Sequence, residues 1–222
     1  MSALDRTFLV AARELAAERR HPDGLVAALT FTGLLVLIES LAFGPAQARQ
    51  PVVASALFWI AMAFAAILAT GRSFERELED DALDAILALP GGRDAIYAGK
   101  TLALAGLTGL VAIVGGVLAL LLLSLDLALP GHLVIVTIAG VLALPPVVVL
   151  FVVLALRLRS RGALVPILVL PVLVPQLVAA TNGVASAVSG DAVGAIGWAG
   201  LLVAFALVYS VLGLTIVPAA LE

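Results

Sequence analysis

The amino-acid sequence predicts an all-α polytopic membrane protein with six transmembrane helices, and three observations support that prediction. Of the 222 residues, 63% are hydrophobic and only 12% are charged, whereas an ordinary soluble domain is about half apolar and about a quarter charged. The mean hydropathy is +1.22, and a soluble domain of this size cannot hide so large an apolar excess. Six stretches are long enough to cross a bilayer, and the basic residues gather on one side of them. We therefore expect one transmembrane domain, residues 1–222.

An amphipathic helix is predicted at the N-terminus, over residues 2–20. Ser2 and Asp5 match the S-x-x-D capping pattern that starts a helix, and apolar residues recur at helical spacing from Leu4 to Leu15. The opposite side carries basic residues and Glu14. Such a helix is suited to lie along the inner membrane surface; a solvated helical tail is the alternative. The segment lacks the pattern of a cleavable signal peptide, so we expect insertion to use the first span.

Each predicted span is a mostly apolar stretch of about 20 residues, the length that a helix needs to cross the hydrocarbon core. Lipid offers the backbone no hydrogen-bond partners, so the spans are expected to be helical. The segments between them, at 44–51, 71–100, 126–132, 157–162 and 182–192, are predicted to be turns or loops. The predicted spans cover residues 25–43, 52–70, 101–125, 133–156, 163–181 and 193–217.

Eleven of the twelve basic residues lie in segments that would share one face of the membrane. They occur before the first span, between the second and third, and between the fourth and fifth, and Arg49 alone falls on the opposite side. Because basic loops are retained in the cytoplasm, we expect a multi-pass protein of the bacterial inner membrane with both termini in the cytoplasm.

The longest inner segment, residues 72–96, is predicted to contain an acidic amphipathic helix over Phe74–Leu89. Its apolar residues fall within about a third of a helical wheel, its acids occupy most of the rest, and Pro90-Gly91-Gly92 ends it. The acids would lie in its first turns, where the helix dipole favours them. Anionic lipid repels an acidic face, so this face suits a basic protein surface. The alternative is a charged face that only keeps the loop soluble.

The sequence offers little support for catalysis. It has no cysteine, and its two histidines, His21 and His132, have no second ligand at the spacing of a metal motif. We expect no enzyme activity, no catalytic residue and no metal site in this chain. Glu39 is the one acid clearly inside an apolar run. It is either a functional group, as carboxylates in membranes commonly are, or a side chain that reaches the headgroups. Glu39 and His132 are the candidates for contact with cargo or with the outer face.

Prolines interrupt the fourth and fifth predicted spans, at Pro145, Pro146, Pro166, Pro171 and Pro175. Each removes a backbone donor and bends a helix. Bent spans suit a moving transporter bundle, and a static bundle equally allows them. No G-x-x-x-x-G-K-[ST] phosphate loop occurs in the sequence. If transport is driven by ATP, another polypeptide must therefore hydrolyse it.

Together these features resemble the ABC-2-type exporter permeases, and within them the CcmB family, the B subunit of the cytochrome c maturation haem exporter. That family has an inner-loop signature, F-x-x-D-x-x-D-G-S-L. Phe74, Asp80 and Leu83 match it, and Glu77 stands in place of the first acid. Asp-Ala at positions 81–82 replaces Gly-Ser, so we expect a continuous helix there rather than a tight turn.

Further strings match the same family. They are Leu89-Pro90, Lys100 at the foot of the third span, and RSRGALVPILVLPVLVPQLV over residues 159–178. The resemblance covers essentially the whole chain and implies a permease without catalytic residues, acting in haem export or delivery for c-type cytochrome biogenesis. Alternatives are an ABC-2-type exporter permease for another apolar cargo and a non-transporting membrane scaffold for cytochrome c assembly.

The resemblance also implies partners. They are a separate cytoplasmic ABC ATPase (CcmA-like) that binds ATP, a haem-handling membrane subunit (CcmC-like), a second copy of the chain and the lipid bilayer, without nucleic acid. No cofactor is expected on this chain itself. The acidic helix would be the coupling helix, with its apolar residues in a groove of the ATPase and its acids on the basic rim. The predicted interface residues are Phe74, Glu77, Leu78, Asp80, Asp81, Leu83 and Ile86.

Overall fold

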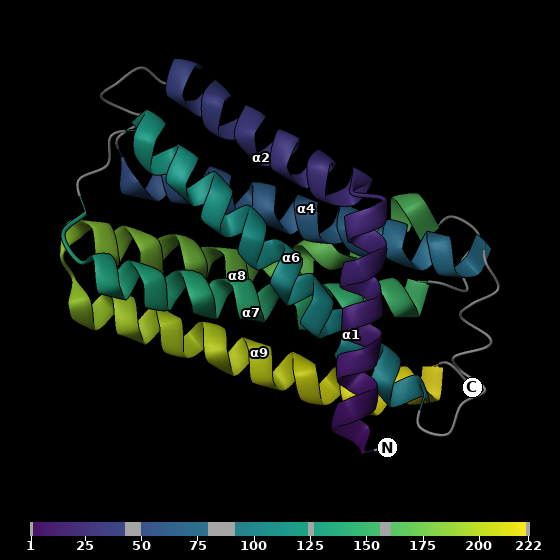
Figure 1. Cartoon of the computed structure of the whole chain (residues 1–222). Helices are drawn as coiled ribbons and strands as arrows, with labels where there is room; N and C mark the ends of the chain where they lie inside the picture. The colour runs from purple at the N-terminus through teal and green to yellow at the C-terminus, as the bar shows by residue number, and fades with distance from the viewer. Residues whose placement is uncertain (1, 43–49, 80–91, 124–126, 156–160, 221–222) are drawn as a thin grey trace.

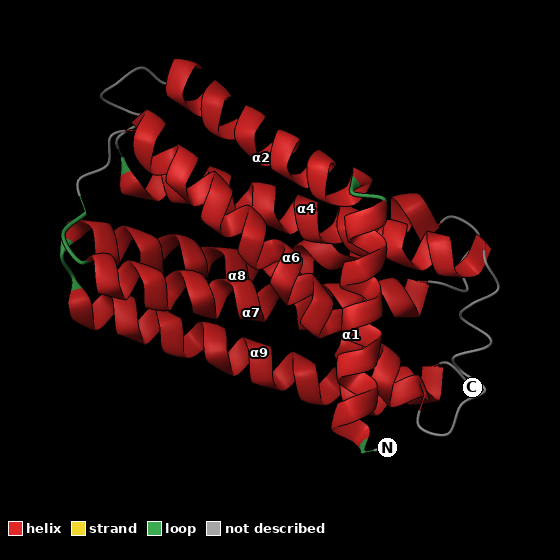
Figure 2. Cartoon of the chain, viewed as in Figure 1, coloured by secondary structure: helices red, strands yellow, loops and turns green. Residues whose placement is uncertain are grey.

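The computed structural model describes residues 2–42, 50–79, 92–123, 127–155 and 161–220, and within these ranges it contains α-helices and no strand (Figure 2). Six of the helices are long and apolar enough to cross a membrane, and the first, α1, is the amphipathic one. The predicted all-α class with six transmembrane helices is therefore confirmed. In chain order the helices are α1 Ala3–Arg20, α2 Asp23–Ala42, α4 Pro51–Glu79, α6 Gly92–Leu123, α7 Pro130–Ala155, α8 Arg161–Ser189 and α9 Ala192–Ala220.

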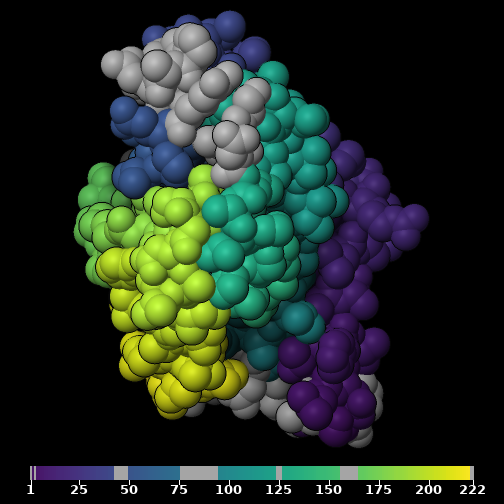
Figure 3. Space-filling view, turned by 90° about the vertical axis from the view of Figure 1, so that its left-hand side faces the viewer, coloured from purple at the N-terminus to yellow at the C-terminus, as the bar shows by residue number. Residues whose placement is uncertain are grey.

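The six long helices run back and forth in one bundle, and α1 crosses them at one end (Figure 1). Both termini lie at the end that α1 crosses, which we call the proximal end; the opposite end, where α6 stops and α7 starts, is the distal end. In α7, 78% of the apolar stretch is buried, against 22% in α2 and 17% in α9. Thus α7 is the centre of the bundle, while α2 and α9 lie at opposite flanks (Figure 3).

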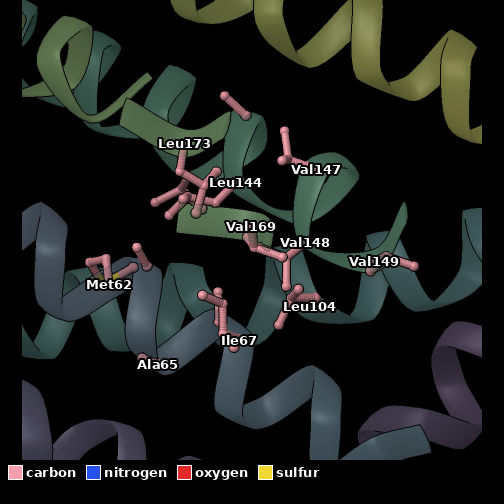
Figure 4. Packing of buried hydrophobic residues seen from close by; sticks show 14 of the residues in the cluster. Met62, Ala65, Ile67, Leu104, Leu144, Val147, Val148, Val149, Val169 and Leu173 are labelled. Atoms are coloured by element: carbon pink, nitrogen blue, oxygen red, sulfur yellow. The ribbon is translucent and has the colours of Figure 1, made fainter. Parts of the chain in front are cut away.

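The core is formed by aliphatic side chains of the central helices, among them Met62, Leu144, Val148 and Leu173 (Figure 4). Because lipid tails are as apolar as these side chains, the helices must be held by close packing rather than by escape from water. Small residues allow that packing. A Cβ at Gly140 of α7 would overlap the indole of Trp59, which lies directly against it.

The predicted N-terminal helix is confirmed, together with its capping box. The amide of Asp5 donates to Ser2 Oγ at 3.1 Å, and the amide of Ser2 donates to Asp5 Oδ2 at 2.8 Å. The hydrogen bond from the backbone amide of Ser2, followed by the interaction with the Ser2 hydroxyl, lowers the pKa of the Asp5 carboxyl from its ordinary value.

Three helix ends differ from the predicted loop bounds: α4 runs past residue 70, α6 begins at Gly92 rather than near residue 101, and α8 continues past residue 181. The sequence predicts that the second span ends near residue 70 and that a separate helix begins at Phe74, but α4 runs unbroken from Pro51 to Glu79. Glycine alone is a weak helix breaker, and the residues after Gly71 are mostly good helix formers. The acids up to Glu79 therefore lie in the last turns of α4, where the helix dipole opposes them, and not in a first turn.

The helix of the fifth span also continues beyond the predicted loop boundary, because α8 runs to Ser189. The side-chain amide of Asn182 donates from Nδ2 to the backbone carbonyl of Val178 at 2.9 Å, so this residue lies within the helix instead of ending it. Gly183 is needed where α8 passes α7, since a Cβ there would lie 2.8 Å from Val136 Cγ1.

Candidate functional site

A buried polar cluster lies at the proximal end, where α1 meets α4 and α6. The ammonium of Lys100 on α6 donates to Glu14 Oε1 at 3.0 Å and to Ser73 Oγ at 2.5 Å. The Ser73 hydroxyl in turn donates to Glu14 Oε2 at 2.6 Å. These three side chains, which we call the Lys100 cluster, form a closed triangle that joins three helices.

Burial of a charge is costly unless it is paired and hydrogen-bonded, and Lys100, only 3% exposed, has both kinds of partner. The Phe74 ring is a further partner of Lys100, because Nζ lies over its face, 4.3 Å from the ring centroid. A cation over an aromatic face is attracted by the ring quadrupole, and more strongly when water is excluded. The cluster is therefore a set of short, charge-assisted contacts with little freedom to rearrange.

This geometry bears on the expectation that Phe74 contacts an ATPase, which stays a prediction. The ring is 1% exposed and is covered within the chain, so it is not a free surface side chain that could enter a partner's groove. The physical reason is the unbroken α4: Phe74 lies one turn beyond Thr70 on a helix that is packed in the bundle, not on a separate surface helix.

Close contact seats α1 against α6 beside the cluster. A Cβ at Gly99 would lie 2.5 Å from Val10 Cβ and 3.0 Å from the Thr7 carbonyl oxygen, so only glycine lets the two helices meet here. Glu18, 5% exposed, accepts a 2.7 Å hydrogen bond from the amide of Leu25 in the first turn of α2. A carboxylate at a helix N-terminus is favourable. Thus α1 is fixed to α2, α4 and α6.

Tyr97, one turn before Lys100, ties the start of α6 to the other side of the bundle. Its hydroxyl lies 2.8 Å from the carbonyl oxygen of Tyr209 on α9 and 3.1 Å from that of Pro146 on α7. Gly213 provides the space, because a Cβ there would overlap the phenol. Sequence reasoning missed this residue, and its one signal was a tyrosine at the foot of an apolar span.

The cluster brackets the segment that the sequence predicts to contact an ATPase. Ser73 and Phe74 lie near the end of α4, and Lys100 lies near the start of α6, so both ends of that segment are joined to each other and to α1. Glu77 and Leu78 lie in the last turns of α4, and for these two residues the structure describes the helical backbone alone. The other predicted interface residues, Asp80, Asp81, Leu83 and Ile86, lie outside the described residues.

The two remaining candidates lie elsewhere. Glu39 is 1% exposed on α2, on the face it shares with Thr32 and Val36, and neither carboxylate oxygen has a hydrogen-bond partner. Its side chain therefore does not extend out of the bundle toward headgroups. His132 is half-buried in the first turn of α7. In the part of the chain that the structure describes, no group of three or more His, Asp or Glu residues could hold a metal ion.

Comparison with known proteins gives one consistent result. A family model described as CcmB protein matches residues 6–222, nearly the whole chain. Heme exporter protein B of Bradyrhizobium diazoefficiens is 30% identical over 166 residues, 75% of each chain. Heme exporter protein B of Haemophilus influenzae is 28% identical over 170 residues, 77% of each chain. That of Pseudomonas aeruginosa is 27% identical over 204 residues, 90% of each chain.

Proposed function

The chain belongs to the CcmB family, and on that premise we propose that it is the permease subunit of an ABC-type complex that exports haem for cytochrome c maturation. Its relatives are named heme exporter protein B, and its six long apolar helices fit a multi-pass membrane protein. We place the proximal end, with both termini, in the cytoplasm of a bacterial cell. Within the described part of the chain, nine basic residues lie on α1 or at the ends of α4, α6 and α8 that are found there, and basic segments are retained in the cytoplasm.

We assign ATP hydrolysis to a separate cytoplasmic subunit, a CcmA-like ATPase, because this sequence contains no phosphate-binding loop. We assign haem handling to a CcmC-like membrane subunit, because neither histidine has a second ligand at a suitable spacing. The permease then supplies the membrane path and the contact through which the ATPase acts.

One observation supports this division of labour most directly: the Lys100 cluster joins the two ends of the cytoplasmic segment to α1. A force on a loop whose two ends can move independently is lost in bending of the loop. Here a displacement of the segment would be passed at once to α4 through Ser73, to α6 through Lys100 and to α1 through Glu14. Packed side chains, hydrogen bonds and ion pairs that form a contiguous set of this kind can carry coupling over a distance.

The test is capture of the ATPase by variants of the cytoplasmic segment. We expect Leu78→Asp and Leu83→Asp to insert normally in the membrane but to lose most of the ATPase on purification in mild detergent, and to lose c-type cytochrome maturation. Leu127→Asp is the matched control, because Leu127 is partly exposed (36%) at the distal end; it should retain the ATPase. Normal capture by both cytoplasmic variants would contradict the proposal, and normal maturation without the ATPase would favour a non-transporting scaffold.

A further inference from the structure

The distal half of the bundle contains a cavity that the coupling mechanism does not use. Its volume is about 440 Å³, within the range of about 300–1,000 Å³ typical of small-molecule sites. Four helices line it: α4, α6, α7 and α8. The side chains from α4 and α8 include Ser55, 4% exposed, and Val188, 7% exposed, so these helices form its inner wall.

The cavity exists because α6 and α7 separate toward the distal end. Nearer the middle of the bundle they touch, since a Cβ at Gly109 would be in ordinary contact with Val141 at 3.8 Å. Beyond that point the two helices diverge (Figure 1). Gly116 of α6 lines the cavity, and a Cβ there would meet no atom within 4 Å. The adjacent Gly115 is crowded by Thr32, whose Cγ2 would lie 2.8 Å from a Cβ. The space beside Gly116 is therefore open rather than filled by packing.

The mouth of the cavity faces the hydrocarbon region. Four of its lining residues are also exposed on the outside of the bundle: Ile113 (67%) and Val117 (52%) on α6, and Val134 (57%) and Ile138 (54%) on α7. Both helices are long and apolar enough to cross a membrane, so an opening between them leads sideways into lipid. None of the described lining residues is charged.

One polar group in this apolar wall has no partner. The hydroxyl of Ser55 is buried and makes no hydrogen bond. A buried hydroxyl without a partner is unfavourable in apolar surroundings. Ser55 lies four residues from the distal start of α4 at Pro51, about 6 Å along the helix. With Pro51 placed at the distal membrane surface, Ser55 would lie near the level of the phospholipid ester groups.

We propose that this cavity binds one acyl chain of a phospholipid from the distal leaflet, which enters between α6 and α7. Its ester carbonyl accepts a hydrogen bond from Ser55 after rotation about χ1 turns the hydroxyl, which has almost no accessible surface in its present rotamer, toward the cavity. An acyl chain restores the dispersion contacts that an empty apolar space forfeits. Water is a poor occupant, because each buried water needs two or more polar partners. The lipid is also the molecule present at the mouth. The bound acyl chain would hold α6 and α7 apart and could leave the cavity again.

Photo-crosslinking tests the site. The protein is reconstituted in vesicles of phosphatidylethanolamine and phosphatidylglycerol that contain a small fraction of phospholipids with a diazirine either near the ester group, at the level of Val188, or near the end of one acyl chain, at the level of Ala112. After illumination, adducts are mapped by peptide mass spectrometry. We expect adducts at Ala112 and Val188, which line the cavity but are only 5% and 7% exposed. Adducts confined to the outer surfaces of α2 and α9 would overturn the proposal.

Matched glycine variants separate the cavity from the general lipid shell. Gly116→Phe should fill the space and reduce the Ala112 and Val188 adducts about ten-fold, because a close-packed site excludes the chain. Gly197→Phe on exposed α9, where a Cβ also meets nothing, should leave them unchanged. Ser55→Ala should reduce them about three-fold, the effect of one hydrogen bond. Unchanged adducts in Gly116→Phe and Ser55→Ala would overturn the lipid assignment. Loss of the adducts when an equimolar tetrapyrrole is added before illumination would also overturn it.

Discussion

Lys100 of α6 and Glu14 of α1 form a buried ion pair, 3.0 Å from Nζ to Oε1, with side chains that are 3% and 11% exposed. The two residues are 86 positions apart in the chain. Arg13 also pairs with Glu14, at 3.1 Å, but its side chain is 43% exposed. The Glu14 carboxylate is thus paired with a buried cation, Lys100, and with a more exposed one, Arg13. Removal of the two cations should therefore lower the stability of the fold by different amounts.

Lys100→Met should be strongly destabilising, because it leaves the Glu14 carboxylate without its buried cation. Breaking a buried pair from one side costs about 3–5 kcal/mol, whereas an exposed pair contributes about 0–1 kcal/mol. Arg13→Met is therefore the matched control. Thermal unfolding in detergent should show a large loss for Lys100→Met and a small one for Arg13→Met, and equal losses would contradict the burial argument.

The double variant Glu14→Met/Lys100→Met separates stability from coupling. Replacement of a whole buried ion pair by apolar residues is often neutral or stabilising, so the double variant should unfold near the wild-type temperature. If the Lys100 cluster transmits the ATPase's motion, c-type cytochrome maturation in cells should nevertheless remain low. Recovery of both stability and maturation would show that the cluster is only structural.

Gly99 should be the least replaceable glycine at the α1 contact. Gly99→Ala places a Cβ 2.5 Å from Val10 Cβ, so α1 must move away from α6 and weaken the cluster beside it. Gly71→Ala should instead stabilise by about 0.5–1 kcal/mol, because alanine is the better helix former and a Cβ at Gly71 meets nothing within 4 Å. Limited proteolysis should release α1 more readily only in Gly99→Ala, and Val10→Gly, which removes the opposing Cβ, should partly restore protection. Equal protection in both glycine variants would be inconsistent with the crowded contact.

The sequence predicts what local patterns determine. Hydropathy marks the six spans, because a helix needs about 20 apolar residues to cross the bilayer, and Ser2 with Asp5 marks the start of α1, because the capping box spans four residues. Tertiary contacts set the rest. Helical periodicity shows that Phe74 lies on an apolar face, but it does not show whether a partner or α6 covers that face. The pairing of Glu14 with Lys100 leaves no local trace, since either charge alone resembles a solvated residue.

Phe74→Ala should destabilise the fold rather than act as a clean docking variant. The ring is 1% exposed and lies under Lys100, and truncation of a buried phenylalanine costs about 3–5 kcal/mol. Phe74→Leu keeps most of the packing and removes the cation–π contact, so it should cost about 0.5–2 kcal/mol. Urea titration of tryptophan fluorescence in detergent measures both. A wild-type titration for Phe74→Ala would show that the ring is exposed.

Glu39 gives the sharpest test of whether a buried acid in a span is functional. Its carboxylate is 1% exposed and has no hydrogen-bond partner, so the protein loses stability by keeping it there. Glu39→Leu should therefore raise the unfolding temperature, by about 2–4 °C per kcal/mol for a chain of this length. Thr32→Val is the matched control, because the Thr32 hydroxyl lies on the same face of α2, is also fully buried and also lacks a partner. Carboxylates retained in spans commonly mark a transport path, so Glu39→Leu alone should lower cytochrome maturation while both variants gain stability. Full maturation in a stabilised Glu39→Leu protein would assign the acid no role in export.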